Sequence, residues 1–476
     1  MSADLDCVEL PRSAVLRSVR RHIGLSFLSH PSAYAVGVCV VSLLSMATTL
    51  IVPRLLDPVA FGSFALLGTL FQYAARADLG LSQLADRDLA RAGATDAGAA
   101  AARGVALLRA SWALGLLAIV ILTPLAVAGA VASGRFAPGD AALAVVAGVL
   151  GMVAHAPTSL YRATSQHWDF ALLALLQQAS LTAPRLAGLL IGGVTGCFAA
   201  LLLCSGLLAL AFAHPGHALA WRLPVVLPMV RAALPLFVFN GFWLVAVTAN
   251  RWIAALLSAP DQLGLFAFGA NLALVGLTIV GAVAQVRYPK LLGAMARAPE
   301  GRSDLLAGEL RRVSLVLAAG ALAAIPVTAP LIALLFPGYE GAAGATVWLA
   351  LACLPLGAVA WVVPMALVLT DAPLREAVRV FGPTLVVLAA AMTAGDALAG
   401  IAGQGLACAA TGLFLFVGLA GIFRRAGILS PQAARRAVAT QAVLLGLLAL
   451  AAALWLHDAA PGATGSIPVP SGEASR

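Results

Sequence analysis

Long apolar runs alternate with short polar segments along the whole chain. A membrane-spanning α-helix needs roughly 20 consecutive, mostly apolar residues. Thirteen segments meet this requirement, at 33–53, 61–81, 105–131, 141–161, 169–192, 194–213, 232–257, 262–288, 313–336, 345–370, 377–395, 400–423 and 437–457. The pattern predicts an all-α polytopic membrane protein with about 12–14 transmembrane helices.

Composition agrees with this interpretation. Of the 476 residues, 62% are hydrophobic and only 10% are charged, whereas soluble domains carry about 25% charged residues. Residues 1–31 are polar and basic and contain no apolar run of the kind that a secretory signal needs. We therefore expect the first span to be uncleaved.

The distribution of positive charge predicts how the chain is oriented. If the N-terminus is cytoplasmic, 23 of the Lys and Arg residues fall on the cytoplasmic side and three, Arg54, Arg135 and Arg476, on the outer side. Cytoplasmic loops of membrane proteins carry such an excess of Lys and Arg. The net charge of +9 is explained in this way, and nucleic-acid binding is not expected. The outer loops are too short to hold a catalytic domain.

Two stretches of sequence resemble each other. LLDPVAFGSFALLGTL at 55–70 and LLSAPDQLGLFAFGANL at 256–272 align Gly62 with Gly264 and Phe64 with Phe266. Each stretch follows one apolar span and opens the next. With an even number of spans per half, such repeats are parallel and related by an axis along the membrane normal. Chance similarity between two loop-to-helix junctions is the alternative.

The repeat predicts two six-helix lobes around a central cavity. The expected organisation is a cytoplasmic tail at 1–31, an N-terminal lobe at 32–213, a cytoplasmic linker at 214–231, a C-terminal lobe at 232–424, an additional span at 437–457 and a disordered tail at 458–476. The last segment is rich in Pro, Gly and Ser, which is typical of disorder.

Four charged residues lie at membrane depth: Arg76, Asp78, Arg185 and Arg251. A charge at the centre of a span costs roughly 2.5–3.5 kcal/mol on insertion scales. We therefore expect these side chains to face a polar interior. Arg76 and Asp78 could instead neutralise each other, and Arg251 could extend to the outer surface.

Polar side chains share helix faces in both halves of the chain. Gln72 and Arg76 lie four residues apart, Asn240 and Arg251 lie eleven apart, and Asn271 and Gln285 lie fourteen apart. These spacings place each pair on one side of a helix. The stripes predict a polar cavity between two lobes, although polar residues also join helices within membranes without further function.

The excess of Arg over acidic residues favours an anionic cargo, because a guanidinium group binds phosphate oxygens in a two-pronged manner. Our candidate cavity residues are Arg76, Arg185, Arg251, Asn240, Asn250, Gln72, Asn271 and Gln285, with Asp78 as the candidate for ion coupling. His214 and His217 are a weak metal signal, and none of the six cysteines has metal-ligand spacing. We expect no metal, cofactor or catalytic residue.

The segment GSFALLGTLFQYAARADLGLSQLADRDLAR at 62–91 resembles the second-span region of bacterial polysaccharide-unit flippases of the multidrug/oligosaccharidyl-lipid/polysaccharide (MOP) superfamily. Members of this family show a G-x-[YF] opening, a D-x-G-[LI] element and a nearby Arg. The corresponding residues are Gly62 with Phe64, then Asp78 to Leu81, then Arg87.

The second half also resembles this family. It carries Asn250 and Arg251, then Gly264 and Phe266, then Pro289, and FPGYEGAAGA at 336–345 resembles the loop before the tenth span. Asn250 replaces the Asp that the family usually carries, which argues against a proton-coupled role for this position.

The resemblance implies a flippase that moves undecaprenyl-diphosphate-linked sugar units from the cytoplasmic to the outer leaflet of the bacterial cytoplasmic membrane, by alternating access. Such proteins serve O-antigen, capsule or exopolysaccharide assembly. Their partners are the polyprenyl-diphosphate-linked oligosaccharide and, in some systems, a polysaccharide polymerase. The anionic pyrophosphate of this cargo agrees with the Arg positions.

Three alternatives stay open. A cation-coupled multidrug antiporter of the same superfamily would need intramembrane carboxylates, and only Asp78 lies well inside a span. A membrane glycosyltransferase or polysaccharide polymerase would be expected to carry a large outer loop or an acidic surface motif. A non-transporting scaffold would not need paired lobes with intramembrane Arg.

Overall fold

The computed structural model describes residues 46–85, 97–163, 167–212, 223–298, 300–369 and 373–459, together with Val40 and Leu44. These residues form helices and short turns. After a helix at Met46–Leu55 come α3 (Pro58–Ala74), α5 (Ala97–Ser133), α6 (Pro138–Ala163), α7 (His167–Phe212), α9 (Leu223–Leu257), α10 (Pro260–Arg297), α11 (Arg302–Leu335), the 3₁₀ turn η2 (Glu340–Ala342), α12 (Ala343–Leu369), α13 (Pro373–Arg425) and α14 (Pro431–Ala459).

Two of these helices reverse direction. In α7 the backbone leaves helical geometry at Gly192 and Gly193, and in α13 it does so at Ala399 and Gly400. The two glycines that end these breaks adopt positive φ angles of 59° and 55°, which favour glycine because it has no Cβ. Each reversal produces a tight hairpin of two antiparallel helices.

The helices account for the thirteen apolar segments expected from the sequence. Nine helices in the described residues are long and apolar enough to cross a membrane, and Met46–Leu55 and Pro58–Ala74 are shorter apolar helices. When the α7 and α13 hairpins are divided at their reversals, the described parts of these segments lie in helices to within a residue, except for the second segment, whose helix is interrupted at 75–80. The prediction of a multi-pass all-α membrane protein is confirmed.

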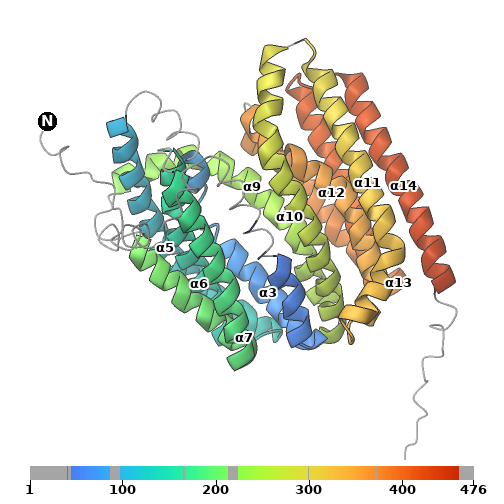
Figure 1. Ribbon diagram of the computed structural model, residues 1–476, viewed down its shortest axis with the longest axis horizontal. Coiled ribbons are helices and arrows are strands. Elements are labelled where there is room, and N and C mark those ends of the chain that lie inside the picture. The colour runs from blue at the N-terminus through green and yellow to red at the C-terminus, as the bar shows by residue number, and fades with distance from the viewer. Residues whose placement is uncertain are drawn as a thin grey trace, which may run out of the picture.

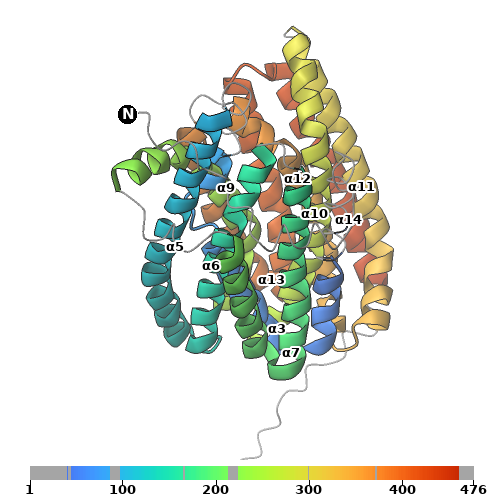
Figure 2. The same ribbon diagram turned by 60° about the vertical axis from the view of Figure 1, so that its left-hand side comes forward.

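The helices form two lobes (Figure 1). The N-terminal lobe consists of the Met46–Leu55 helix, α3, α5, α6 and α7. Within it, α6 packs against α3, α5 and α7 (Figure 2). The C-terminal lobe consists of α9 to α14, in which α12 packs against α10, α11 and α13, and α14 packs against α11. The main contact between lobes joins α3 to α10.

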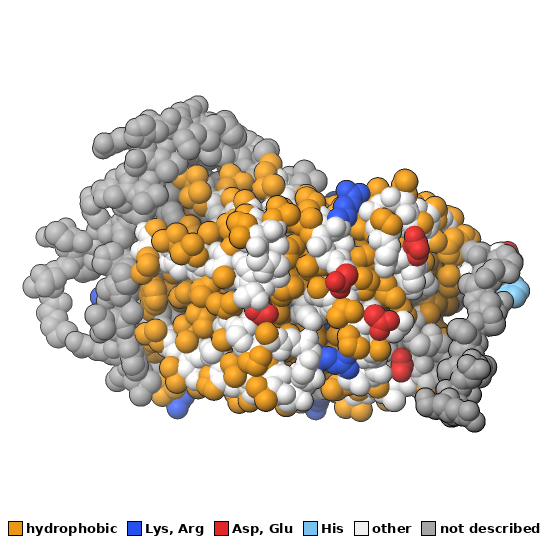
Figure 3. Space-filling view, turned by 90° about the horizontal axis from the view of Figure 1, so that it is seen from below, with side chains coloured by type: hydrophobic (Ala, Val, Ile, Leu, Met, Phe, Trp, Pro, Cys, Tyr) orange, Lys and Arg blue, Asp and Glu red, His pale blue; other side chains and the backbone are white. Residues whose placement is uncertain are grey.

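We name the two ends of the molecule after the orientation that the Arg distribution predicts. The outer end carries the starts of α3, α6 and α10, and the cytoplasmic end is opposite. Asp57 caps α3, and Asp140 and Asp261 lie in the first turns of α6 and α10, where carboxylates favour the helix dipole. Acidic side chains are accordingly visible on this face (Figure 3).

The second span differs from the expected continuous helix at 61–81. Helix α3 ends at Ala74, residues 75–80 form turns, and a helix resumes at 81–85. Leu79 and Gly80 have positive φ angles of 48° and 87°. A Cβ at Gly80 would lie 2.8 Å from the carbonyl oxygen of Ala233, so this glycine permits α9 to approach the break closely.

Two other boundaries differ from those expected from the sequence. Helix α9 begins at Leu223, within the segment expected to be a linker, because the apolar residues after this point continue the helix. Helix α14 continues to Ala459, two residues into the expected C-terminal tail. The remainder of that tail and the N-terminal tail at 1–31 lie outside the described residues.

Candidate transport cavity

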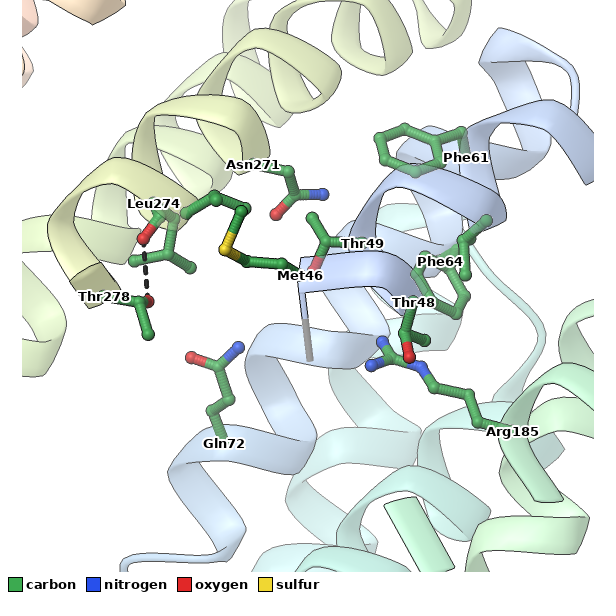
Figure 4. A pocket seen from close by; sticks show the side chains of 12 residues that line it. Met46, Thr48, Thr49, Phe61, Phe64, Gln72, Arg185, Asn271, Leu274 and Thr278 are labelled. Atoms are coloured by element: carbon green, nitrogen blue, oxygen red, sulfur yellow. Dashed lines mark hydrogen bonds between the residues drawn. The ribbon is translucent and has the colours of Figure 1, made fainter. Parts of the chain in front are cut away.

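A cavity of about 330 Å³ lies where the two lobes meet. The N-terminal lobe contributes Thr48, Gln72 and Arg185, and the C-terminal lobe contributes Asn271 and Thr278. Figure 4 shows Gln72 and Asn271 pointing toward the same space from α3 and α10. None of the described residues that line this cavity is acidic. The cavity therefore offers one fixed positive charge surrounded by neutral hydrogen-bonding groups.

Arg185 supplies that charge. Its guanidinium carbon lies 4.7 Å from the centre of the Phe64 ring, at a distance where cation–π attraction operates. The Nε atom is buried and has no hydrogen-bond partner among the described residues. An aromatic ring thus positions this guanidinium group without neutralising it, and its donors can serve a ligand.

Gln72 connects this cavity to two others in the N-terminal lobe. A space of about 140 Å³ is lined by Gln72, Gln178, Thr182 and Arg185. A larger one, of about 580 Å³, extends toward the cytoplasmic end. Its polar lining residues are Gln72, Arg76, Asp78, Ser82, Gln83, His155, Gln177, Gln178, Ser180 and Ser205. The side chain of His155 is hydrogen-bonded to Gln177 at 2.8 Å.

Arg251 is placed differently from Arg185. It is 2% exposed and lines none of these three cavities. Its guanidinium group donates to Asn271 at 2.6 Å and to Thr69 at 3.4 Å. Arg251 therefore joins α9 to α10 and to α3, and the alternative that it extends to the outer surface is wrong. It reaches the central cavity only through Asn271.

Asp78 is engaged by its own backbone. Its carboxylate accepts hydrogen bonds from the backbone NH of Gly80 at 3.2 Å and of Ser82 at 2.9 Å, and a further one from the Ser82 hydroxyl. These bonds cap the short helix that resumes at residue 81, as N-cap carboxylates do. Both oxygens of this acidic group therefore have partners in the structure.

The remaining candidates from the sequence are spread more widely. Asn240 is half-buried and lines none of the three cavities. Asn250 is buried and turns toward α13, where its amide donates to the Cys408 sulfur at 3.7 Å. The side chain of Gln285 lies outside the described residues. Of the eight proposed cavity residues, Gln72, Asn271 and Arg185 share one space, and Arg76 lies in the adjoining one.

Sequence reasoning missed two buried acidic residues with Arg partners. Glu309 of α11 accepts two hydrogen bonds from Nη2 of Arg287, at 3.0 and 3.1 Å. Glu376 of α13 is bonded to Arg425 and, at 3.3 Å, to Arg379. Both acids lie among cytoplasmic Arg residues of a predominantly basic segment, which is the only sequence signal that could have identified them.

The outer side of the cavity is closed by a crossing of α3 and α10. A Cβ at Gly62 would lie 3.2 Å from the backbone nitrogen of Gly264, and a Cβ at Gly264 would lie 1.7 Å from the carbonyl oxygen of Pro58. The two aligned glycines of the sequence repeat therefore bring the repeats into direct backbone contact.

Aromatic rings from both lobes pack beside this crossing. Phe61 of α3 lies 5.8 Å from Tyr339 between ring centres, and Phe268 of α10 lies 4.7 Å from the same ring. The Tyr339 hydroxyl donates to the carbonyl oxygen of Leu56 at 2.8 Å. Burial and the charge of Asp57 raise the pKa of Tyr339, so the hydroxyl keeps the proton that it donates.

Two arginines at the outer end also join the lobes. Together with the crossing of α3 and α10 and the aromatic rings beside it, they form what we call the outer seal. Arg54 Nε donates to the carbonyl oxygen of Leu335 at 3.1 Å, and Arg135 Nη2 donates to that of Ser258 at 3.0 Å. Each bond joins the N-terminal lobe to the C-terminal lobe. Two of the three basic residues assigned to the outer side thus hold the lobes together there.

The described residues contain no group of three or more His, Cys, Asp or Glu side chains arranged to hold a metal ion. The charged side chains among the described residues that line the three cavities are those of Arg76, Asp78 and Arg185.

Solved structures reveal what this architecture resembles. The lipid II flippase MurJ, in an inward closed conformation, matches with a TM-score of 0.62 at 10% sequence identity, over 88% of this chain and 92% of MurJ. The Vibrio cholerae MATE transporter VcmN matches with a TM-score of 0.57 at 16% identity, over 84% and 96% of the two chains. A further MATE structure matches with a TM-score of 0.51.

The chain has the MOP fold. No protein-family model and no curated protein sequence matches it, so the similarity is one of fold. The MOP fold accounts for the two lobes and for the cavity between them. What the cavity can bind depends on the side chains that line it.

Proposed function

We propose that the protein is a lipid-linked oligosaccharide flippase, which moves undecaprenyl-diphosphate-linked sugar units from the cytoplasmic to the outer leaflet by alternating access. The observation that carries this proposal is the Arg185 guanidinium in a cavity between the lobes that no acidic side chain of the described residues lines. A pyrophosphate group would supply the negative charge that the cavity lacks.

The adjoining space of about 580 Å³ suits the sugars of such a cargo. Its lining is rich in amide and hydroxyl groups, among them Gln83, Gln178, Ser180 and Ser205. These groups can donate to and accept from sugar hydroxyls. In this arrangement the diphosphate lies near Arg185, the saccharide lies toward Arg76, and the polyprenyl chain stays in the bilayer. The fold of MurJ, whose structure is that of a lipid II flippase, supports this class of cargo.

The proposed flippase lies in the bacterial cytoplasmic membrane with its N-terminus in the cytoplasm, and its working units are the lobes at 32–213 and 232–424. Its product would supply a polysaccharide polymerase for O-antigen, capsule or exopolysaccharide synthesis. The sequence places 23 Lys and Arg residues on one side of the membrane and three on the other, and this bias supports the orientation.

A cation-coupled multidrug antiporter is the second candidate, because MATE transporters share the fold. Coupling to a cation needs a carboxylate that can release its present partners. Among the described residues that line the three cavities, Asp78 is the acidic one, and its bonds cap a helix. This arrangement favours the flippase over the antiporter.

A deletion strain separates these functions. The flippase predicts that lipid-linked sugar units accumulate in the cytoplasmic leaflet and that surface polysaccharide is lost. Wild-type protein should restore the polymer, and Arg185→Gln, produced at the same level, should not. Normal polymer combined with altered drug tolerance would overturn the flippase and favour the antiporter.

A further inference from the structure

A second polar pocket lies far from the transport cavity, between α11 and α14 at the cytoplasmic end. Its volume is about 230 Å³. The polar side chains that line it are Asp304, Arg311, Ser314, Ser430, Gln432, Arg436 and Thr440. Helices α11 and α14 lie at the edge of the C-terminal lobe (Figure 1). The pocket therefore belongs to the rim of the lobe and not to the interface between lobes.

The two arginines of this pocket are unengaged. The guanidinium groups of Arg311 and Arg436 make no ion pair or hydrogen bond with another described residue, although both arginines line the same small space. Some other arginines of this lobe's cytoplasmic end do have partners. Arg302 donates to the Gly427 carbonyl oxygen, Arg287 pairs with Glu309, and Arg425 pairs with Glu376. Two unpaired guanidinium groups in one pocket form a receptor for an anion.

The pocket is polar down to its base. The Ser314 hydroxyl, which lines it, accepts a hydrogen bond from Gln441 at 2.7 Å. Gln441 is fully buried, and its Oε1 atom has no hydrogen-bond partner among the described residues. Ser430 fixes the entrance, because its backbone NH donates to Ser303 of α11 at 2.9 Å. The start of α14 is thereby held against α11.

Exposed apolar side chains continue outward from the pocket along both helices. Leu315 and Val316 of α11 are 49% and 71% exposed, and Val443 and Leu447 of α14 are 60% and 61% exposed. The basic, polar pocket at the cytoplasmic end thus continues into an apolar surface that leads toward the bilayer centre. A membrane lipid has the same sequence of chemical groups.

We propose that this pocket binds the phosphate group of a glycerophospholipid of the cytoplasmic leaflet, with its acyl chains along α11 and α14. Basic pockets between transmembrane helices on the cytoplasmic side suit anionic headgroups, and two guanidinium groups can grip one phosphate from both sides. Asp304 lies at the same pocket and lowers its net positive charge. The site is separate from the transport cavity, so it does not depend on which cargo is moved.

The sequence provides a matched control. Arg312 and Arg435 are neighbours of the two pocket arginines, are also exposed, and do not line the pocket. The double variant Arg311→Gln with Arg436→Gln can therefore be compared with Arg312→Gln plus Arg435→Gln. Both remove two charges from the same helices and the same end of the lobe.

The experiment measures lipid retention by native mass spectrometry of the purified full-length protein in detergent, with phosphatidylglycerol, diacylglycerol or inorganic phosphate added. We expect the pocket double variant to lose phosphatidylglycerol affinity by roughly 30-fold, since each basic residue near a lipid headgroup contributes about a fivefold effect. The control double variant should retain the lipid. Thermal unfolding without lipid verifies that both variants are folded.

Three results would overturn the proposal. Equal loss in the two double variants would assign the effect to general charge. Equal retention of diacylglycerol and phosphatidylglycerol would show that the phosphate is not recognised. Competition by millimolar inorganic phosphate with no preference for the lipid would assign the pocket to a free anion.

Discussion

Helices α3 and α10 begin alike and end differently. Each starts with a proline after a residue in extended conformation, Asp57 or Ala259, and the two helices cross at Gly62 and Gly264. Thereafter α10 continues as one helix to Arg297, whereas α3 ends at Ala74. The shared start forms the seal between lobes.

The interiors of the two lobes differ where these two helices differ. Beside the broken second span, the N-terminal lobe contains the polar spaces that Gln72, Arg76 and Arg185 line. The corresponding part of the C-terminal lobe is filled by a buried apolar cluster in which Phe239 and Phe242 pack on Phe381, at 5.5 and 5.9 Å between ring centres. A symmetric scaffold therefore carries an asymmetric chamber, which suits a cargo with one polar head.

The largest expected loss of stability comes from a substitution at the crossing of α3 and α10. Gly264→Ala places a Cβ 1.7 Å from a backbone oxygen, which rigid neighbours cannot accommodate. We expect the free energy of unfolding to fall by about 3 kcal/mol or more, at the upper end for overpacking. Thermal unfolding in detergent measures it.

Two alanine variants calibrate that result. Gly62→Ala meets its nearest atoms at 3.2–3.3 Å and should cost less, because small shifts relieve the contact. Gly281→Ala, in α10 with no atom within 4 Å, should be nearly neutral. If all three variants were equally stable, the crossing would not be a close backbone contact.

The next prediction concerns the break in the second span. Gly80→Ala combines a φ of 87° with a Cβ 2.8 Å from the Ala233 carbonyl oxygen. We expect a loss of about 2–3 kcal/mol, since left-handed strain and the displaced α9 add. Gly134→Ala shares the positive φ, at 62°, and meets no atom within 4 Å, so it should cost only about 1 kcal/mol. Equal melting temperatures for the two variants would contradict the close approach of α9.

A smaller effect tests the outer seal. Replacing Arg54 and Arg135 by Gln removes two hydrogen bonds between the lobes, each worth about 1 kcal/mol or somewhat more. The reporter is Thr278→Cys, which places a thiol in the central cavity. We expect a membrane-impermeant maleimide added from the outer side to label this thiol several-fold faster in the double Gln variant than in the protein that keeps both arginines. The six natural cysteines are replaced beforehand. Arg297→Gln, at the cytoplasmic end of α10, serves as the control, and an unchanged labelling rate would remove the two arginines from the seal.

The pattern of hydrophobic and polar residues along the sequence predicted much of this architecture. Hydropathy located the apolar segments that the structure describes, because the cost of exposing backbone to lipid makes spans apolar helices. The sequence repeat aligned Gly62 with Gly264, but only the structure shows that these two glycines meet at the contact between lobes. The break after Ala74 was missed, since Gly80 and Gln83 fit the helical spacing of Gln72 and Arg76 when the segment is read as a continuous span.

The candidate site could be predicted only in part. Arg185 and Arg251 look equivalent as isolated charges within apolar segments, yet one lines a cavity and the other is buried on Asn271 and Thr69. The difference arises from how α9, α3 and α10 meet, which no single-helix pattern records. Glu309 and Glu376 were missed for the same reason, because their Arg partners come from other helices or follow from the fold of a hairpin.

The central claim is that Arg185 holds the anionic head of a lipid-linked cargo, and flipping in proteoliposomes tests it most directly. The assay measures how fast a fluorescent polyprenyl-diphosphate-linked saccharide becomes accessible to a membrane-impermeant quencher. The account predicts that Arg185→Gln slows flipping by about 10- to 100-fold, as expected when a charge-assisted hydrogen bond is lost, with Arg185→Lys in between and the melting temperature unchanged. Flipping by Arg185→Gln at the wild-type rate would contradict it.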